Sequence, residues 1–284
     1  MTGKPLGSSA LGSEDGWDGT VGRHWVEHEE RHDRMLVSLT ARLLDAAGIS
    51  PEDKVLDVGC GCAETSRAAA RQASAGEVLG VDISGPMLAQ ARGRAEDEHL
   101  ANLRFEQADA ESADLPGTYF DLALSRFGVM FFGDAKAAFV NIARALRPGG
   151  RLAFLCWQEV GKNEHIVVPF SVLVSFGLTP DIGGPGTPGP FSLADPGRIR
   201  ELLGEAGCTD IEIEPVNERL PFGSDVPDVL TYFRGHPVAA PLIAGMDEAT
   251  LARLMDELGK AVLPFQTPDG VYFGSSAWLV TARR

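Results

Sequence analysis

The chain has 284 residues, of which 25 are basic and 40 acidic, so its net charge is −15. This length is enough for one large core or a core with a subdomain, and a hydrophobic content of 44% is ordinary for a globular protein. The excess of acidic residues disfavours nucleic acid and anionic membranes as partners, because phosphates require clusters of Lys and Arg.

Residues 1–16 are polar and rich in Gly and Ser, which predicts a flexible N-terminus. Helices are expected over residues 17–48, where Trp17, Val21, Trp25 and His28 recur at helical spacing. Two interpretations of this stripe remain open. It forms either a lid over a bound ligand or a core-packing face with one solvated histidine.

The segment from His28 to His32 reads H-E-x-x-H, the spacing with which zinc proteases place two histidines on one helix face beside a catalytic glutamate. Its neighbours are mostly charged, whereas a metal-binding helix normally lies in a core. We therefore predict a solvated acidic helix here and no metal site.

A buried strand is predicted over Val55–Val58, because its apolar residues are nearly continuous and β-branched. Gly59 and Gly61 follow directly and allow the backbone to turn sharply and approach a ligand. From Glu64 the pattern becomes helical and rich in alanine. A strand, a glycine loop and a helix in this order indicate a nucleotide-like pocket.

Glu64 stands where the dinucleotide fingerprint has its third glycine, and an acid there opposes a pyrophosphate at the helix N-terminus. A cationic ligand such as S-adenosylmethionine suits Asp57 and Glu64 better. The acid and glycines at Asp57, Gly59 and Gly61 resemble the first motif of the class I S-adenosylmethionine-dependent methyltransferases. Ala63 replaces the usual third glycine of that family.

The second strand, residues 78–81, ends at Asp82, which is placed to accept hydrogen bonds from both ribose hydroxyls. Asp82 also has a simpler interpretation as a helix cap, although Ser84 is the better cap. The resemblance extends over this segment and implies that Ile83 and Met87 contact the adenosine.

A third strand is predicted at residues 103–105, after which Asp109 and Ala110 match the family's adenine-binding acid and its small neighbour. The alternative for Asp109 is a plain polar turn. A fourth strand, Phe120–Ser125, leads into Arg126 and Phe127, where the resemblance implies that cofactor meets substrate.

Asp134 is expected to cap a helix that stops at residues 147–150, before a fifth strand over Arg151–Trp157. Four motifs in this order predict an α/β fold. We expect a Rossmann-like seven-stranded methyltransferase sheet with helices on both faces, a core over residues 49–160, an N-terminal helical lid and a helical cap insertion before the last strand.

Residues 161–284 are expected to supply the substrate cap and the C-terminal strands. The Gly/Pro-rich segment 179–190 either gates the site or is a plain linker. The other expected elements are helices at 164–176 and 195–203, a strand at 211–213, a mainly helical region at 225–264 and a last strand at 271–282.

The resemblance and the positions of these motifs together define a set of candidate site residues. The expected cofactor-binding residues are Asp57, Gly59, Cys60, Gly61, Asp82, Ile83, Met87, Asp109, Ala110, Ser125, Arg126 and Trp25. The expected substrate-binding residues are Phe127, Trp157, Tyr232 and Phe233. The candidate general bases are His165, His24, His28 and His236. His165 is the first choice because it follows the fifth strand closely.

The resemblance implies methyl transfer from S-adenosylmethionine to an O, C or N atom of a small metabolite, in secondary metabolism. The alternative is a protein that binds this cofactor without transferring its methyl group, such as a cyclase or a binding protein. Four cysteines are too few for a disulfide framework and are expected to be reduced. No apolar run reaches the ~20 residues of a membrane span, so we expect a cytoplasmic monomer or homodimer.

Overall fold

Five apolar segments form the parallel strands of a central sheet in the computed structural model, which describes residues 14–284. Most of the expected flexible N-terminus, residues 1–16, lies outside the described residues. The strands are β1 (Lys54–Val58), β2 (Glu77–Asp82), β3 (Leu103–Gln107), β4 (Phe120–Arg126) and β5 (Leu146–Trp157). Val55, Leu56 and Leu122 are fully buried, as expected for strands covered by helices on both faces.

Two long antiparallel strands complete the sheet next to β5. They are β8 (Gly270–Arg283), which pairs with β5, and β6 (Thr209–Gly223), which pairs with β8. The strand order is β3-β2-β1-β4-β5-β8-β6, and the two-residue β7 (Gln266–Thr267) pairs with β8 beside this path. The expected seven-stranded sheet is therefore confirmed, with one short strand added.

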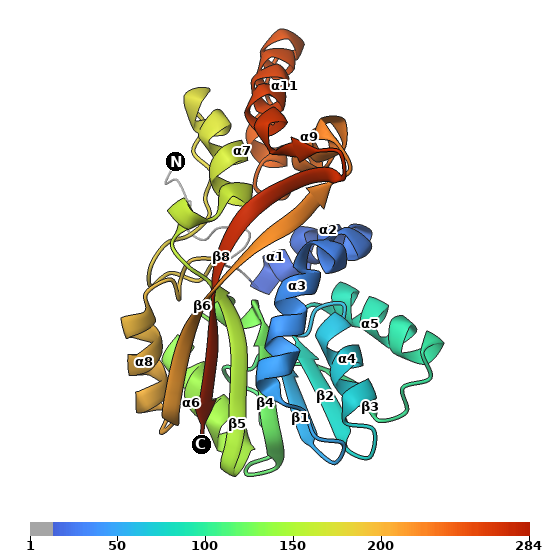
Figure 1. Ribbon diagram of the computed structural model, residues 1–284, viewed down its shortest axis with the longest axis vertical. Helices are drawn as coiled ribbons and strands as arrows, with labels where there is room; N and C mark the ends of the chain where they lie inside the picture. Colours follow the sequence, from blue (N-terminus) through green and yellow to red (C-terminus); the bar gives the residue numbers. More distant parts are fainter. Residues whose placement is uncertain (1–13) are drawn as a thin grey trace, which may run out of the picture.

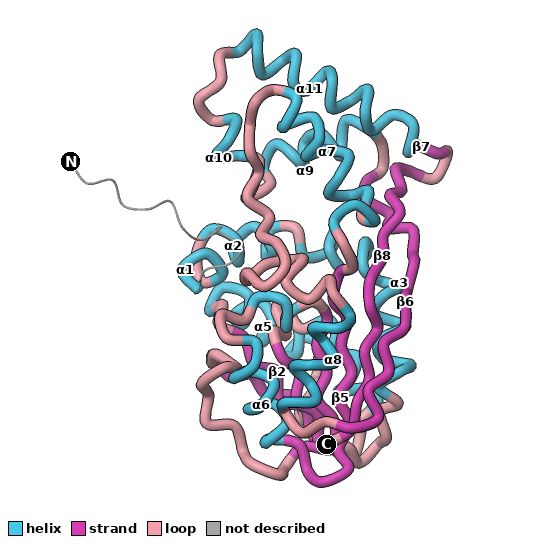
Figure 2. The backbone as a smooth tube through the Cα atoms, turned by 90° about the vertical axis from the view of Figure 1, so that its left-hand side faces the viewer, coloured by secondary structure: helices cyan, strands magenta, loops and turns pink. Residues whose placement is uncertain are grey.

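Helices cover both faces of the sheet (Figures 1 and 2). One face carries α3 (Glu29–Ala47), α4 (Glu64–Gln72) and α5 (Gly85–Asp97), and the other carries α6 (Ala135–Ala145) and α8 (Pro196–Glu205). Three of these helices begin at the predicted residues. In each, the side-chain oxygen of the capping residue accepts a hydrogen bond from a backbone amide of the first turn that has no partner within the helix. The caps are Ser84 for α5, Asp134 for α6 and Asp195 for α8.

Strand β6 is much longer than the three residues expected at 211–213. Pro215 and Pro221 interrupt its sequence pattern and argue against a strand. The structure places β6 at the edge of the sheet, where a missing amide hydrogen costs no ladder hydrogen bond. This edge position explains why a strand of 15 residues tolerates two prolines.

A helical cap stands above one end of the sheet, and three of its four helices, those within residues 225–264, form the expected insertion before the last strand. It consists of α7 (Glu164–Ser175), α9 (Val226–Gly235), α10 (Ala240–Ile243) and α11 (Glu248–Val262), with short 3-10 turns at Val160–Lys162 and Leu263–Phe265. Strands β6 and β8 extend beyond the parallel strands and lead into the cap (Figure 1). Helix α11 packs against α7 and α9.

The N-terminal segment forms three helices, because the chain bends near Gly19 and His28. They are α1 (Glu14–Trp17), α2 (Thr20–Glu27) and α3. Helix α2 packs closely on α5, since a Cβ added at Gly22 would lie 2.5 Å from the Ser84 Oγ. The N-terminal helices are thereby fixed to the sheet close to the end of β2.

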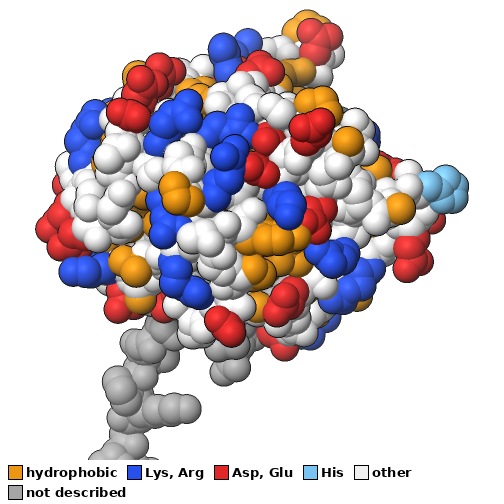
Figure 3. Space-filling view, turned by 90° about the horizontal axis from the view of Figure 1, so that it is seen from below, with side chains coloured by type: hydrophobic (Ala, Val, Ile, Leu, Met, Phe, Trp, Pro, Cys, Tyr) orange, Lys and Arg blue, Asp and Glu red, His pale blue; other side chains and the backbone are white. Residues whose placement is uncertain are grey.

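The opposite end of the sheet carries interspersed basic and acidic side chains (Figure 3). Arg104 pairs with Glu77 there at 2.8 Å, and Arg151 pairs with Asp53. The Arg104–Glu77 pair, whose arginine is exposed, contributes about 0–1 kcal/mol, whereas Asp53 of the other pair is buried. Within residues 14–284, no helix combines the length and apolar character needed to cross a membrane.

Candidate functional site

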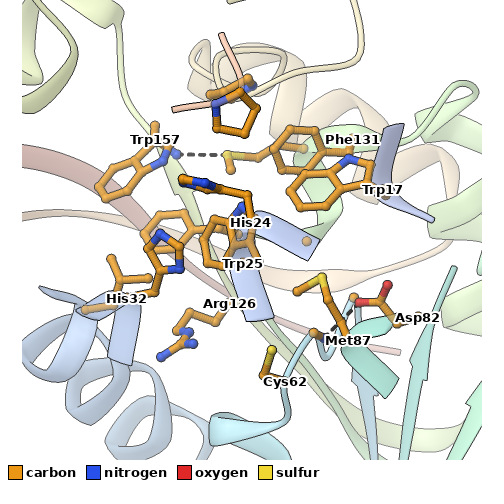
Figure 4. A pocket seen from close by; sticks show the side chains of 18 of the residues that line it. Trp17, His24, Trp25, His32, Cys62, Asp82, Met87, Arg126, Phe131 and Trp157 are labelled. Carbon is orange, nitrogen blue, oxygen red and sulfur yellow. Dashed lines mark hydrogen bonds between the residues drawn. The ribbon is translucent and has the colours of Figure 1, made fainter. Parts of the chain in front are cut away.

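A cavity of approximately 430 Å³ lies at the carboxyl ends of the parallel strands, beneath the N-terminal helices and the cap. This is within the usual size range of ligand pockets, and the carboxyl ends of parallel strands are where open α/β sheets bind ligands. Figure 4 shows Asp82 and Met87 on one side of the cavity and His24 and Trp157 on another. We refer to the part next to β1 and β2 as the sheet end and to the part under α7 and α9 as the cap end.

The loops after β1 and β4 touch each other at the floor of the sheet end. Gly59 has a φ of +67°, and a Cβ added there would lie 2.8 Å from the Gly128 Cα. Phe127 also has a positive φ, +65°, which is strained for a residue other than glycine. This conformation accompanies a stack of Phe127 on Trp157, with ring centroids 4.0 Å apart.

Asp82 holds the glycine loop and the start of α5 together. Its Oδ2 accepts from the Gly61 amide at 2.8 Å, and its Oδ1 accepts from the Ser84 amide at 2.9 Å. Burial raises the pKa of Asp82, while these amide hydrogen bonds act in the opposite direction. The side chain lines the cavity at the tip of β2, where the sequence predicts a ribose contact.

Most other predicted cofactor-binding residues also line the cavity. Gly61 lies close to Met87, because an added Cβ would be 2.8 Å from the Met87 Cε. Asp109 accepts a hydrogen bond from the Glu111 amide at 2.9 Å, as in a polar turn, and it also lines the cavity. The two interpretations of Asp109 are therefore compatible. The remaining predicted residues found in the lining are Gly59, Cys60, Ile83, Ala110, Arg126 and Trp25.

Asp57 and Ser125 differ from the expectation, because neither belongs to the cavity lining. The Oδ2 of Asp57 accepts from the hydroxyls of Thr65 at 2.7 Å and Ser66 at 2.5 Å, and its Oδ1 has no hydrogen-bond partner. The Ser125 hydroxyl donates to the Val58 carbonyl at 2.6 Å. Both side chains therefore hold the loop and helix that shape the cavity from behind.

The sheet end is rich in acid, including two residues that the sequence analysis missed. Arg126 pairs with Glu64 at 3.1 Å and with Asp33 at 3.3 Å, so its charge is compensated where it lines the cavity. Glu29 is buried in the lining and pairs with Arg94 at 2.8 Å. Trp25, Glu29 and Asp33 recur at a spacing of four, a signal that would have found both acids.

Four histidines line the cavity from α2, α3, α7 and the end of α9. Burial lowers the pKa of His165 to about 4, and burial together with His28 lowers that of His24 to about 4. Burial, with His24, His165 and His28, lowers the pKa of His236 to about 3, and burial lowers that of His32 well below 6.5. All four are neutral at pH 7. His28, the remaining candidate base, is not in the lining but packs on His24 at 4.5 Å.

Three of these imidazoles have a buried nitrogen without a hydrogen-bond partner: Nε2 of His24, Nδ1 of His32 and Nδ1 of His165. A buried polar atom left unpaired costs roughly 1–3 kcal/mol, so such atoms in a cavity lining indicate a missing polar partner. The other nitrogen of His32 is fixed, since its Nε2 lies 2.9 Å from the Tyr232 hydroxyl.

The expectation of a solvated acidic helix at His28–His32 was wrong. Glu29 and His32 are 5% and 3% exposed, because α3 faces both the cavity and α5. Glu29 is engaged by Arg94 and His32 by Tyr232. No group of three or more His, Cys, Asp or Glu side chains among the described residues is arranged to hold a metal ion.

Aromatic side chains dominate the cap end. The predicted Phe127, Trp157, Tyr232 and Phe233 all line it, and so do Phe170 and Phe222, which the sequence analysis missed. The Gly/Pro-rich segment 179–190 contributes Ile182 and Pro190 to the lining, so it is more than a linker. Cys60 and Cys62 lie in the lining of the sheet end, and all four cysteines are unpaired.

Acid should destabilise the folded protein through His165. An unfolded histidine binds a proton below its ordinary pKa of 6.5, whereas folded His165 remains neutral until about pH 4. Between these values acid favours the unfolded chain, and full stability is present only above about pH 7. We expect a loss of about 2 kcal/mol through this residue between pH 8 and pH 5.

Urea unfolding of the wild type and His165→Phe at both pH values would measure this contribution. The quantity to compare is the change in unfolding free energy between pH 8 and pH 5 in each protein. Burial raises the pKa of Asp57 to about 6, which favours the folded state at low pH, but this effect is the same in both proteins and cancels in the comparison. His99→Asn, at an exposed site, controls for the loss of one histidine. An equal pH dependence in all three proteins would contradict the prediction.

Comparisons with known proteins agree with this geometry. Residues 55–150 match a family model described as a methyltransferase domain. The chain is 38% identical over 114 residues to the aklanonic acid methyltransferase DauC of Streptomyces sp. (strain C5), covering 40% of this chain and 52% of that protein. It is 36% identical over 141 residues to the ubiquinone/menaquinone biosynthesis C-methyltransferase UbiE of Chromobacterium violaceum, covering 49% and 56%.

The chain spans about half the length of the curated relatives it matches. Among solved structures, phosphoethanolamine N-methyltransferase 2 of Haemonchus contortus, in complex with S-adenosylhomocysteine, superposes with a TM-score of 0.58. The identity is 20%, and the match covers 99% of this chain and 61% of that one. The structural likeness confirms the fold, and the family match confirms the resemblance of the core motifs.

Proposed function

We propose that this chain, whose residues 55–150 match a methyltransferase domain, uses S-adenosylmethionine to transfer a methyl group to a small molecule held in the cap end of its cavity. The observation that carries the proposal is the division of one cavity into two ends. The sheet end combines a glycine loop with several acids, and the cap end is aromatic. Such a pair of sites suits a cationic nucleoside cofactor beside an apolar acceptor.

The described residues fit the cofactor. Asp82 lies at the tip of β2 for the ribose, and the backbone of Gly59 and Gly61, which carries no Cβ, lines the cavity beside it. Ile83 and Met87 offer apolar contacts for the adenine ring. Asp82 and Asp109 line the cavity and form no ion pair with an Arg or Lys side chain among the described residues, so they leave negative charge that favours a positively charged ligand.

When bound, S-adenosylmethionine supplies a methyl group already activated by its sulfonium. The protein then has to align the acceptor and exclude water. The stacked rings of Phe127 and Trp157, both less than 10% exposed, line the cavity and offer an apolar surface to the acceptor. A neutral imidazole such as that of His165 is able to accept a hydrogen bond from an acceptor hydroxyl, although its pKa of about 4 makes it a weaker proton acceptor than an ordinary histidine; we expect a carbon or amine acceptor to need no such base.

The test is incubation with methyl-labelled cofactor and candidate metabolites of secondary metabolism. Label in the product together with equimolar S-adenosylhomocysteine is the expected result. Conversion of a metabolite without label or S-adenosylhomocysteine would support the alternative, a cyclase that uses the cofactor structurally. Failure to bind S-adenosylhomocysteine in calorimetry would overturn both.

A further inference from the structure

The two ends of the cavity differ in charge as well as in shape. The acidic lining residues Glu29, Asp33, Asp82, Asp109 and Glu111 all come from α3 and from the loops after β2 and β3. In contrast, the lining residues from segments 157–170, 182–191 and 222–238 include no Asp, Glu, Lys or Arg. A ligand enclosed by these three segments would meet no counter-charge from them, and the lining cation Arg126 is already paired with Asp33 and Glu64, so burying an unpaired charge there is costly.

The polar groups of the cap end are imidazoles and one phenol. His24 and His165 line the cavity, are 8% and 7% exposed, and each keeps a buried ring nitrogen without a hydrogen-bond partner. His32 is 3% exposed and keeps Nδ1 unpartnered while Tyr232 holds its Nε2. A neutral imidazole nitrogen either accepts from a hydroxyl or donates to a carbonyl, depending on its tautomer.

Flat rings surround these nitrogens. Trp157 lies between Phe127, at a centroid distance of 4.0 Å, and His165, at 5.0 Å. His32 lies against Trp25 at 3.9 Å, and Figure 4 shows both beside His24. Aromatic ligands gain from stacked or edge contacts with such rings.

We propose that the cap end binds an uncharged, planar aromatic molecule whose hydroxyl or carbonyl oxygens pair with the free nitrogens of His24, His32 and His165. This rests on the proposed function, since the bound molecule is then the methyl acceptor. It selects against carboxylates, phosphate esters and quaternary amines as acceptors. The three histidines act as specificity determinants, and the aromatic rings supply the shape of the site.

Calorimetry with three matched probes tests the proposal in the presence of saturating S-adenosylhomocysteine. The probes are 2,7-dihydroxynaphthalene, naphthalene and 3-hydroxy-2-naphthoate, which share one ring system. We expect the dihydroxy compound to bind at least tenfold more tightly than either of the others. Naphthalene lacks the oxygens, and the naphthoate brings a charge without a partner.

The variant His165→Phe keeps a ring of similar size but removes the nitrogen. It should weaken binding of 2,7-dihydroxynaphthalene about tenfold and leave that of naphthalene within twofold. His24→Phe should behave in the same way. Leu263→Ala, at an exposed cap site, is the matched control and should change neither affinity. Unaltered affinity for S-adenosylhomocysteine in each variant shows that the protein is folded.

The outcomes separate this inference from the proposed function. If S-adenosylhomocysteine binds but the naphthoate binds as tightly as the dihydroxy compound, the inference is overturned and the proposed function stands. The inference is also overturned if naphthalene binds as tightly as the dihydroxy compound, or if the dihydroxy compound does not bind. It is overturned as well if neither histidine variant weakens binding of the dihydroxy compound more than binding of naphthalene. If S-adenosylhomocysteine itself does not bind, the proposed function fails first.

Discussion

Replacement of Gly59 by alanine is expected to destabilise the folded protein by about 2–5 kcal/mol. An alanine at φ +67° costs about 1–2 kcal/mol of backbone strain, and overpacking adds about 1–3 kcal/mol. The overpacking arises because the new Cβ would lie 2.8 Å from the Gly128 Cα, a backbone atom that moves only with its loop. Urea unfolding at pH 8 measures the loss.

Gly149 provides the matched control. It also has a positive φ, +76°, but an added Cβ meets no atom within 4 Å. Gly149→Ala should therefore cost only the strain, about 1–2 kcal/mol. Equal losses in the two variants would show that the contact between the loops after β1 and β4 is not tight. A larger loss for Gly59→Ala would confirm that it is.

Asp82→Ala is expected to weaken binding of S-adenosylhomocysteine by about 10- to 150-fold. Charge-assisted hydrogen bonds are worth about 1.5–3 kcal/mol, and the variant also releases the amides of Gly61 and Ser84. Calorimetry well below the melting temperature of each variant separates lost affinity from lost stability.

Two controls accompany Asp82→Ala. Asp82→Asn keeps one acceptor oxygen without the charge and should bind with intermediate affinity. Asp45→Ala removes an acid at an exposed position of α3 and should leave affinity unchanged. Wild-type affinity in Asp82→Ala would remove this residue from the ribose role.

The core of the fold was predictable because its signals are local. A buried strand such as Val55–Val58 and the glycine loop that follows it can be predicted from about a dozen consecutive residues. Helix caps such as Ser84 act on the next turn of chain. The edge strand β6 was underestimated because Pro215 reads as a breaker unless its place in the sheet is known.

The cap end was less accessible to sequence reasoning, because it joins distant segments. His32 and Tyr232 are 200 positions apart, and neither residue carries a signal of the other. Glu29 and Arg94 are 65 positions apart, so the charged segment that was expected to be solvated is buried against a partner that its own sequence does not indicate. Burial of charge depends on such partners, which only the tertiary structure supplies.

The long pairing of β6 with β8 determines how the cap is attached to the sheet. Gly223 lies opposite Val271, so the chain leaves the sheet and returns to it at neighbouring positions. The helical segment 225–264, which includes Tyr232, Phe233 and His236, therefore joins the sheet through adjacent positions of β6 and β8, so a change in its length does not by itself require a change in the register of these strands.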